Sequence, residues 1–357
     1  MTEMTMNENN NFNQRLSAAI TWLRFPLIFL IILLHCYSVV RLEGPRVSYF
    51  KAIYAFSLWL GETGVPGFFF ISGYLFFLSK KSYLQKLKTR IHTLLIPYLL
   101  WNTILLSLYL IAYAAGYPQN INYRSITEYS LIDYIRLFWD RGSYDNGNFV
   151  PLLCPFWYIR NLLIMSLLSP LLYYIVKYGR ELFLLIVSIW WMMTYHNAFI
   201  PQTLLFFSLG AYFSIMDVNP LEVIVKYKNW FLALFALFAF ADIAMHTIYA
   251  TPMNLQAHRL ALIFNIPVLL LLADLCVRRK YSTSILPNAA FIVFAVHYPI
   301  VVSLRKFCAA KYVMASDITH IILYFICVII ATIMSIFIYI LLERCLPKLK
   351  NILSGNR

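Results

Sequence analysis

Two ionisable side chains stand inside one long apolar run, and their types and spacing point to chemistry. The run covers residues 20–40, and only Arg24 and His35 interrupt it with strongly polar groups. Eleven residues of α-helix return to nearly the same face, about 16 Å further along the axis. A neutral imidazole can take a proton from a hydroxyl, as the general base of an acyl transfer must. Ionisable groups inside a membrane span are usually functional, although a buried histidine satisfied by a carbonyl and an arginine that snorkels to the headgroups would explain the same pair.

A basic stretch precedes the third apolar run. Residues 80–101 carry five cations, which are Lys80, Lys81, Lys86, Lys88 and Arg90. Such cations suit the phosphates of a cytosolic nucleotide-like cofactor. Charges that set membrane topology or contact anionic lipid explain most of the lysines equally well. Arg90 lies nearest the apolar run, and we expect it to be the exception that binds a phosphate.

Small and polar residues also recur inside later runs. Residues 64–75, GVPGFFFISGYL, include Ser72 and three glycines, and close helix packing is the favoured interpretation of the glycines. Trp157 and Tyr158 begin the stretch 156–170 as an aromatic belt would, and Arg160 one turn further in is either an anion ligand or an interfacial anchor. His297, in the stretch 288–299, is either a second polar wall of a cavity or a helix-packing histidine.

Several other kinds of site are absent from the sequence. It contains no HExxH, P-loop, GxSxG or GxGxxG motif. The six cysteines are scattered singly without a CxxC pair, so neither a disulfide framework nor a metal site is expected. Asp242 and His246 are four residues apart on one helix face, and we expect them to satisfy each other. Acidic residues are sparse within the apolar runs, which counts against a proton-coupled pump.

The composition predicts an all-α integral membrane bundle. Of the 357 residues, 61% are hydrophobic and only 12% are charged, and the mean hydropathy is +0.71. An ordinary globular chain has about a quarter of its residues charged. Apolar runs near 20 residues long favour helices over the strands of a barrel. The net charge of +14 follows from Lys and Arg in the cytoplasmic loops, so we expect contact with membrane lipid and no nucleic-acid partner.

About ten spans, with both termini cytoplasmic, account for the distribution of Lys and Arg. The spans are expected at residues 18–40, 57–79, 93–115, 156–176, 181–196, 200–216, 229–250, 258–276, 287–305 and 319–342. The short fifth and sixth could together form one re-entrant hairpin instead. Residues 1–17 form a polar N-terminal tail without signal-peptide features, residues 18–345 form the membrane domain, and residues 346–357 form a second tail.

Five motifs in order resemble those of the acyltransferase 3 family of integral membrane O-acyltransferases. They are LR-x10-H in the first span, FFxxSGYL in the second, R-x6-PY entering the third, FWYIRNL in the fourth and VHYP in the ninth. The resemblance implies ten core helices, acetyl- or other acyl-coenzyme A used from the cytoplasm, and acylation of hydroxyls on glycans, lipids or antibiotics. It also implies that His35 is the essential histidine, that Arg24 is its paired arginine and that Arg90 belongs to a coenzyme-binding loop.

One departure from the family pattern concerns that loop. The family often carries a second arginine three residues after the first, and Thr93 stands at that position here. Lys86 and Lys88 could therefore share the coenzyme contact with Arg90. Some members also carry an outer hydrolase-like domain that receives the acyl group, and no such domain follows in this sequence.

The resulting hypothesis is a multi-pass O-acetyltransferase of the inner membrane, with an acyl-CoA donor and a glycan, lipid-linked sugar or other hydroxyl acceptor. His35 acts as the general base or as a transient acyl carrier, and the sequence leaves both routes open. The residues expected at the acceptor are Ser72, Trp157, Tyr158, Arg160 and His297. A transporter of a small polar molecule or a lipid-linked sugar is the alternative, but no inverted repeat supports it. An inactive scaffold is the third possibility.

Overall fold

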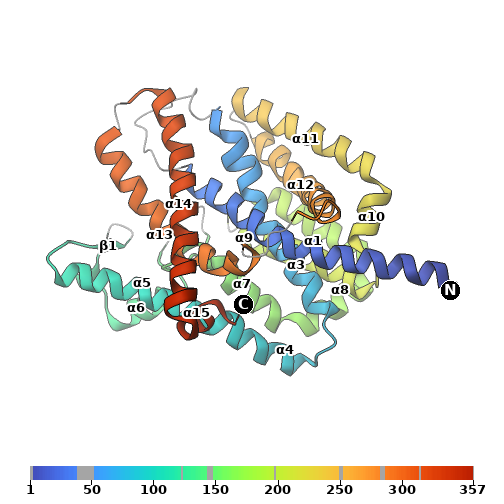
Figure 1. Cartoon of the computed structure of the whole chain (residues 1–357), viewed down its shortest axis with the longest axis horizontal. Helices are drawn as coiled ribbons and strands as arrows, with labels where there is room; N and C mark the ends of the chain where they lie inside the picture. The colour runs from blue at the N-terminus through green and yellow to red at the C-terminus, as the bar shows by residue number, and fades with distance from the viewer. Residues whose placement is uncertain are drawn as a thin grey trace.

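The computed structural model describes residues 3–37, 52–121, 124–142, 148–196, 198–248, 252–281, 286–312 and 315–356. In these residues the chain is a bundle of helices with one short antiparallel ribbon at its edge (Figure 1), so the predicted all-α class is confirmed. The elements are α1 (Glu3–Cys36), η1 (Ala55–Leu60), η2 (Gly61–Thr63), α3 (Gly64–Leu78), α4 (Tyr83–Arg90), η3 (Ile91–Leu95), α5 (Ile96–Ala114), β1 (Asn120–Ile121), β2 (Arg124–Ser125), η4 (Ile126–Glu128), α6 (Leu131–Arg136), η5 (Cys154–Phe156), α7 (Trp157–Leu167), α8 (Ser169–Met193), α9 (Phe199–Ile215), α10 (Pro220–Lys226), α11 (Lys228–Ile248), α12 (Pro252–Arg278), α13 (Leu286–Tyr312), α14 (Asp317–Cys345) and α15 (Pro347–Ser354).

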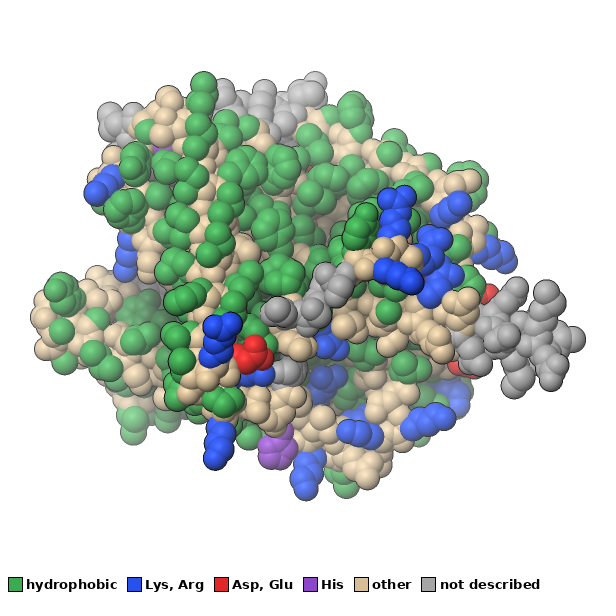
Figure 2. Space-filling view, in the orientation of Figure 1, with side chains coloured by type: hydrophobic (Ala, Val, Ile, Leu, Met, Phe, Trp, Pro, Cys, Tyr) green, Lys and Arg blue, Asp and Glu red, His purple; other side chains and the backbone are tan. Residues whose placement is uncertain are grey.

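The described helices support a multi-pass membrane protein. Six of them are long and apolar enough to cross a membrane, and up to eight spans result if each of two bent helix pairs counts as one. The bends are 73° between α7 and α8, and 94° between α9 and α10. Apolar side chains cover much of the face shown in Figure 2, as lipid contact requires. Ten spans and the orientation of the two termini stay predictions.

Helix breaks explain why the described part has fewer continuous helices than the sequence has apolar runs. The run at 57–79 is divided into the π-turn η1, the 3₁₀ turn η2 and α3. Helix α8 is kinked at Arg180, whose φ of 46° lies outside the helical region. Irregular backbone at membrane depth persists where protein rather than lipid surrounds it. In agreement with this rule, both turns η1 and η2 pack against α1.

Helix α1 is the element around which the others are arranged. It packs against α3, α12, α13 and α14, and it crosses the middle of the view in Figure 1. Near one end, the Arg15 guanidinium donates hydrogen bonds of 2.9 and 2.7 Å to Asp274 of α12. Towards the other end, the Tyr324 hydroxyl of α14 donates a 3.1 Å hydrogen bond to the Leu33 carbonyl. These contacts tie α1 to two neighbours, which fixes the positions of the polar residues between them.

Helices α3 and α9 approach each other so closely that two glycines are required. A Cβ atom at Gly73 would lie 2.0 Å from the Phe207 carbonyl oxygen, and one at Gly210 would lie 2.0 Å from the Phe70 carbonyl oxygen. Small residues at a helix interface permit such backbone contact in membrane proteins. The helix-packing interpretation is therefore confirmed for Gly73, and the contact holds α3 with its Ser72 in place.

We expect Gly210→Ala to destabilise the protein by about 1–3 kcal/mol or more, because a methyl group there must push two backbones apart. The measurement is thermal unfolding of the purified protein in detergent. Gly67→Ala is the matched control on α3, since its Cβ would meet only the flexible end of Leu27, at 2.9 Å. If both variants lose the same amount of stability, the close α3–α9 contact is not the cause of the loss in Gly210→Ala.

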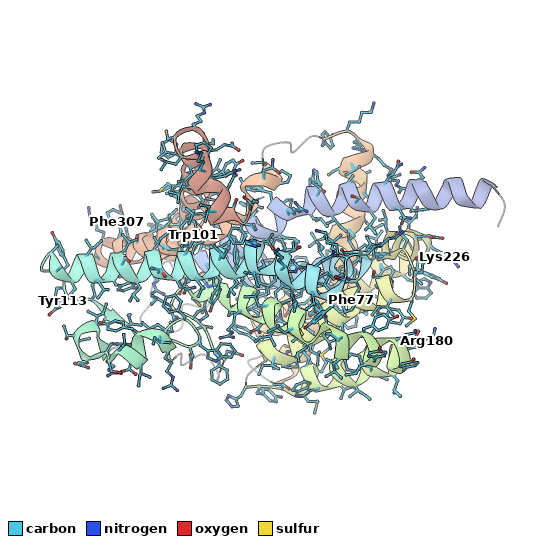
Figure 3. The ribbon with its side chains drawn as sticks, turned by 90° about the horizontal axis from the view of Figure 1, so that it is seen from below. Phe77, Trp101, Tyr113, Arg180, Lys226 and Phe307 are labelled. Atoms are coloured by element: carbon cyan, nitrogen blue, oxygen red, sulfur yellow. The ribbon has the colours of Figure 1, made fainter. Side chains whose placement is uncertain are left out.

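Helix α15 folds back onto the bundle rather than projecting from it. Leu353 and Ser354 are buried, and the Trp101 indole of α5 donates a 3.0 Å hydrogen bond to the Leu353 carbonyl. Trp101 lies along the long axis of α5, which crosses the view in Figure 3. Gly355 ends the helix with a φ of +67°, in the left-handed region that favours glycine. The chain then brings Asn356 to a cavity between the helices.

Candidate functional site

A cavity of about 500 Å³ lies among α1, α3, α7 and α13, and we call it the arginine cavity. It is lined by four of the residues that the sequence singled out, which are Arg24, Ser72, Arg90 and Tyr158. The other lining residues are Ile28, Phe68, Ile71, Leu75, Leu94, Ile159, Leu162, Pro287, Asn288, Ala290, Phe291, Phe294 and Asn356. Mostly apolar walls with a few convergent polar groups are typical of a small-molecule site.

The two arginines make this cavity a candidate anion site. Arg24 comes from α1, and Arg90 ends α4, a helix that begins with a capping box between Ser82 and Gln85. The Arg90 guanidinium lies 5.4 Å from the centre of the Phe76 ring. Among the described residues neither arginine forms an ion pair with a carboxylate. A half-buried arginine without a carboxylate is suited to a phosphate, which it can bind with two parallel hydrogen bonds.

Ser72 and Tyr158 form the hydroxyl side of the same cavity. Their side-chain oxygens share a hydrogen bond of 3.1 Å, which joins α3 to α7. The Tyr158 ring packs edge-on against Phe69, with ring centres 4.7 Å apart, and against Phe294, at 6.0 Å. The pair therefore has a defined geometry and offers polar oxygens within an apolar wall.

His35 and His297 lie together beyond Phe294. The two imidazole rings have their centres 5.4 Å apart, and the His297 ring lies 5.8 Å from Phe294, which also lines the arginine cavity. His297 donates from Nδ1 to the Phe294 carbonyl oxygen at 2.7 Å, so its Nε2 carries the lone pair. In the described part of the chain that buried Nε2 has no hydrogen-bond partner. The site thus contains two imidazoles, one of which has a fixed tautomer and an unused acceptor.

Two residues near His35 were not singled out by the sequence. The Tyr298 ring lies 5.0 Å from the His35 ring in an edge-on arrangement. Arg141, in the long loop between α5 and α7, donates a hydrogen bond to the Tyr298 side chain and acts electrostatically on His35. Tyr298 is part of the VHYP motif and could have been noted beside His297. Nothing in the local sequence marks Arg141, because only the folded loop brings it to α13.

Trp157 and Arg160 have structural partners outside the cavity lining. The Trp157 ring stacks on Phe199, with ring centres 3.8 Å apart and planes 9° apart. The Arg160 guanidinium donates to the carbonyl oxygens of Trp139 and Phe149, at 2.6 and 2.9 Å. Arg160 therefore fastens the long loop, whereas Tyr158 between these two residues faces the cavity. All three stay candidates for acceptor contact.

The same loop begins with a short ordered section. Helix α6 has a capping box in which the Ser130 amide and hydroxyl donate to Asp133. These hydrogen bonds, with the positive charge of Arg124, hold the pKa of Asp133 below its ordinary value. The loop between α5 and α7 thus has defined local structure on both sides of residues 143–147, which are outside the described part.

The two lysines expected at the coenzyme lie on α4 but not in the cavity wall. The Lys86 ammonium is 5.0 Å from the centre of the Phe76 ring, and Lys88 is exposed. Of the four expected coenzyme ligands, the structure therefore brings together Arg24 and Arg90 and leaves the lysines at the edge.

A second polar cluster lies where η2 meets α11 and α12, and it contains Asp242, which the sequence singled out, together with Glu62 and Tyr54, which it did not. The two ring nitrogens of His258 bond Glu62 and Asp242, each at 2.9 Å, and the Tyr54 hydroxyl donates to Asp242 at 2.8 Å. Asp242 is thus bound by two partners far away in sequence, and its expected pairing with His246 stays a prediction. The side chain of His246 is outside the described residues. In the described part of the chain no group of three or more His, Cys, Asp or Glu residues could bind a metal ion.

The fold and the site define a multi-pass α-helical membrane protein with an arginine-lined cavity, whose wall residue Phe294 packs against His297 beside His35. A family model described as "Acyltransferase domain", that of acyltransferase 3, matches residues 17–341. The chain therefore belongs to the acyltransferase 3 family and is an acyltransferase. It is also 29% identical over 316 residues to a Rhizobium meliloti (strain 1021) protein named "Succinoglycan biosynthesis protein ExoH", covering 80% of this chain and 79% of that protein. No solved structure matches this chain.

Proposed function

We propose that this acyltransferase moves an acyl group, acetyl above all, from cytoplasmic acyl-CoA to a hydroxyl of a cell-surface glycan or a related lipid-linked acceptor. The observation that carries the proposal is that the arginine cavity and the two histidines are adjacent, because Phe294 lines the cavity and packs against His297, which lies beside His35. An inner-membrane location with both termini cytoplasmic is part of the proposal, because it places the arginine cavity on the side where acyl-CoA is made.

Each residue of the site has a proposed role that follows from the chemistry of its side chain. Arg24 and Arg90 bind the phosphates of the donor, and the apolar walls accept its pantetheine arm. His35 takes the proton of the acceptor hydroxyl or accepts the acyl group transiently. The unused Nε2 of His297 accepts a hydrogen bond from the acceptor hydroxyl and so holds it near His35. Ser72 and Tyr158 contact the donor arm or the acceptor from the opposite wall.

The acceptor proposal rests on the relative as well as on the site. That relative is named for the biosynthesis of succinoglycan. A polysaccharide hydroxyl, presented on a finished chain or on a lipid-linked repeat unit, is therefore the acceptor class that we propose here. The long loop fastened by Arg160 borders the route by which such a chain would reach His35, and its Arg141 already contacts Tyr298.

The test uses the full-length protein in liposomes with radiolabelled acetyl-CoA and surface glycan from a strain that lacks the gene. We expect free CoA and acetylated glycan to form in equal amounts. Mass spectrometry of the surface glycan from the deletion strain should show loss of the same acetyl groups, and the wild-type gene should restore them. Movement of glycan or sugar across the liposome membrane without release of CoA would instead support the transporter.

A further inference from the structure

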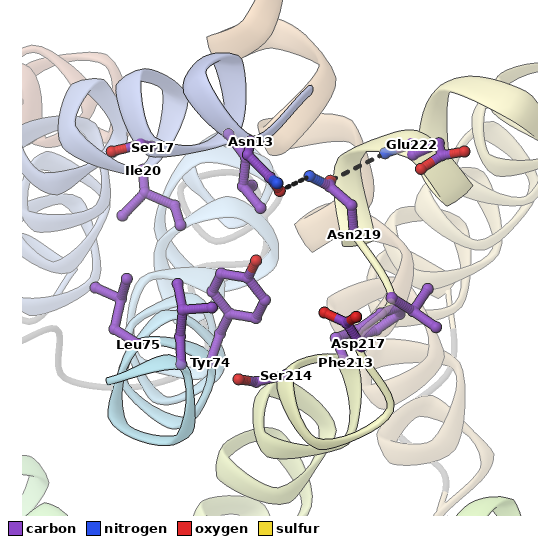
Figure 4. Close-up of a pocket in the computed structure, with 13 residues that line it drawn as sticks. Asn13, Ser17, Ile20, Tyr74, Leu75, Phe213, Ser214, Asp217, Asn219 and Glu222 are labelled. Atoms are coloured by element: carbon purple, nitrogen blue, oxygen red, sulfur yellow. Dashed lines mark hydrogen bonds between the residues drawn. The ribbon is translucent and has the colours of Figure 1, made fainter. Parts of the chain in front are cut away.

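A second pocket lies beside the arginine cavity, and neither the family nor the proposed function assigns it. It measures about 430 Å³ and lies between α1, α3, α9 and the turn that leads into α10 (Figure 4). We call it the Tyr74 pocket. Its polar lining consists of Asn13, Ser17, Tyr74, Ser214, Asp217, Asn219 and Glu222, and its apolar lining consists of Leu16, Ile20, Leu75, Leu78, Phe213 and Val218.

The two cavities are neighbours along the same pair of helices. Leu75 of α3 lines both of them. On α1, Ile20 lines the Tyr74 pocket and Arg24, about one turn later, lines the arginine cavity. The two cavities are therefore adjacent, with Leu75 in the wall of each.

The charges of the two cavities are opposite. Two arginines line the arginine cavity, whereas no Lys or Arg is among the residues that line the Tyr74 pocket, which instead has the carboxylates of Asp217 and Glu222. A phosphate is attracted to the first cavity and repelled by the second. The part of a ligand that enters the Tyr74 pocket should consequently be uncharged and rich in hydrogen-bond donors.

Two hydroxyl groups of the Tyr74 pocket have no hydrogen-bond partner within the described part of the chain. Tyr74 is only 6% exposed, its hydroxyl is directed into the open space in Figure 4, and it makes no hydrogen bond within the described part of the chain. The Ser214 Oγ is buried and also lacks a partner there. Such groups are costly to bury without partners, which indicates that a ligand or water completes them.

The backbone of the turn after α9 and its hydrogen bonds fix the position of Asp217, whose carboxylate lines the pocket. Asp217 has a φ of +56°, a left-handed conformation that aspartate and asparagine tolerate better than most residues. The Asn219 side chain then caps α10 by accepting from the amides of Leu221 and Glu222, at 2.9 and 3.2 Å. It also donates to the Asn13 side chain at 2.8 Å, which ties the turn to α1.

We propose that the Tyr74 pocket binds the adenosine end of the acyl-CoA donor, while Arg24 and Arg90 bind its diphosphate next door. This inference rests on the proposed function. A flat, neutral purine fits between Ile20, Leu75 and Phe213, and its exocyclic amine and the ribose hydroxyl are donors that Asp217 and Ser214 accept. The phosphate on the ribose faces the open mouth, away from the two carboxylates. The pocket volume lies within the range of small-molecule sites.

The test compares acetyl-CoA with acetyl-4′-phosphopantetheine, which keeps the arm and one phosphate of the diphosphate but lacks the adenosine end. Asp217→Asn removes the charge but keeps a side chain that tolerates the left-handed turn, and Ser214→Leu fills the pocket. We expect each variant to lower kcat/KM for acetyl-CoA by about tenfold or more, Asp217→Asn because it loses a hydrogen bond to a charged group and Ser214→Leu because its side chain occupies the site. Neither variant should change kcat/KM for acetyl-4′-phosphopantetheine. Ser303→Ala, at an exposed position of α13, is the control and should leave both values unchanged.

Equal losses with both donors, or no loss with either, would overturn the assignment of the pocket. Equilibrium binding of adenosine 3′,5′-bisphosphate provides a readout that needs no turnover. The wild-type protein and Ser303→Ala should bind this probe, and Ser214→Leu should not. If the probe binds in this way but acetyl-CoA is never turned over, the proposed donor is wrong and the adenosine pocket stands. If Ser214→Leu still binds adenosine 3′,5′-bisphosphate, the adenosine end binds outside the Tyr74 pocket and the proposal is wrong.

Discussion

Replacement of His35 by alanine or glutamine is expected to lower the rate of acyl transfer by about 100- to 10,000-fold, the contribution of a well-placed general base. Glutamine keeps the approximate size and polarity of the side chain but cannot take a proton, so it separates the loss of chemistry from the loss of packing. His35 is partly exposed, and its ring contacts the rings of His297 and Tyr298. The measurement is release of free CoA from acetyl-CoA in liposomes with saturating acceptor.

The matched control is His196→Ala, which removes an exposed imidazole outside the site and should keep wild-type activity. Thermal unfolding in detergent shows whether each variant is folded. A folded His35→Gln protein with wild-type turnover would exclude both catalytic roles of His35. Rapid quenching with labelled acetyl-CoA in the absence of acceptor separates those roles, because only an acyl carrier retains label on the protein, and His35→Ala should abolish that label.

Much of the site could be predicted because its signal is local in the sequence. The spacing between Arg24 and His35 is fixed by helix geometry once the run is known to be helical. The close packing at Gly73 of FFxxSGYL follows from the need for small residues where membrane helices meet. Arg90 was singled out by its position at the edge of an apolar run, and it does line the same cavity as Arg24.

The parts that could not be predicted depend on contacts between residues far apart in the chain. Asp242 binds His258 and Tyr54, because η2, α11 and α12 meet there. The break of the second apolar run into η1, η2 and α3 is likewise a packing effect that hydropathy does not encode.

The same limit applies to individual aromatic and charged groups. Trp157 and Tyr158 are adjacent and equally aromatic in the sequence, yet one stacks on Phe199 and the other faces the arginine cavity. Successive residues of a helix point about 100° apart, so only the neighbouring helices decide which of them reaches a cavity. For the same reason the place of Asn356 in the cavity wall follows from the way α15 packs on α5.

Replacement of Arg24 or Arg90 by alanine is expected to raise the KM for acetyl-CoA by about 10- to 150-fold, as for the loss of a hydrogen bond to a charged group. The effect falls on the donor because both guanidinium groups line the same cavity and neither has a carboxylate partner in the described part of the chain. The rise should shrink at high salt, since phosphate attraction is screened. Lysine at either position should restore only part of the affinity, because an ammonium cannot bind a phosphate through two parallel hydrogen bonds.

The control for this prediction is Lys88→Ala on the same basic helix as Arg90. Lys88 is exposed and is not among the cavity-lining residues, so its removal should change the KM by less than about twofold, as expected for a screened surface charge. Titration with acetyl-CoA at fixed acceptor, and with acceptor at fixed acetyl-CoA, distinguishes the two substrates. An increase in KM for the acceptor alone would assign the arginines to the glycan. A Lys88→Ala effect as large as that of Arg90→Ala would mean that the basic helix attracts the donor by its overall charge rather than through the cavity.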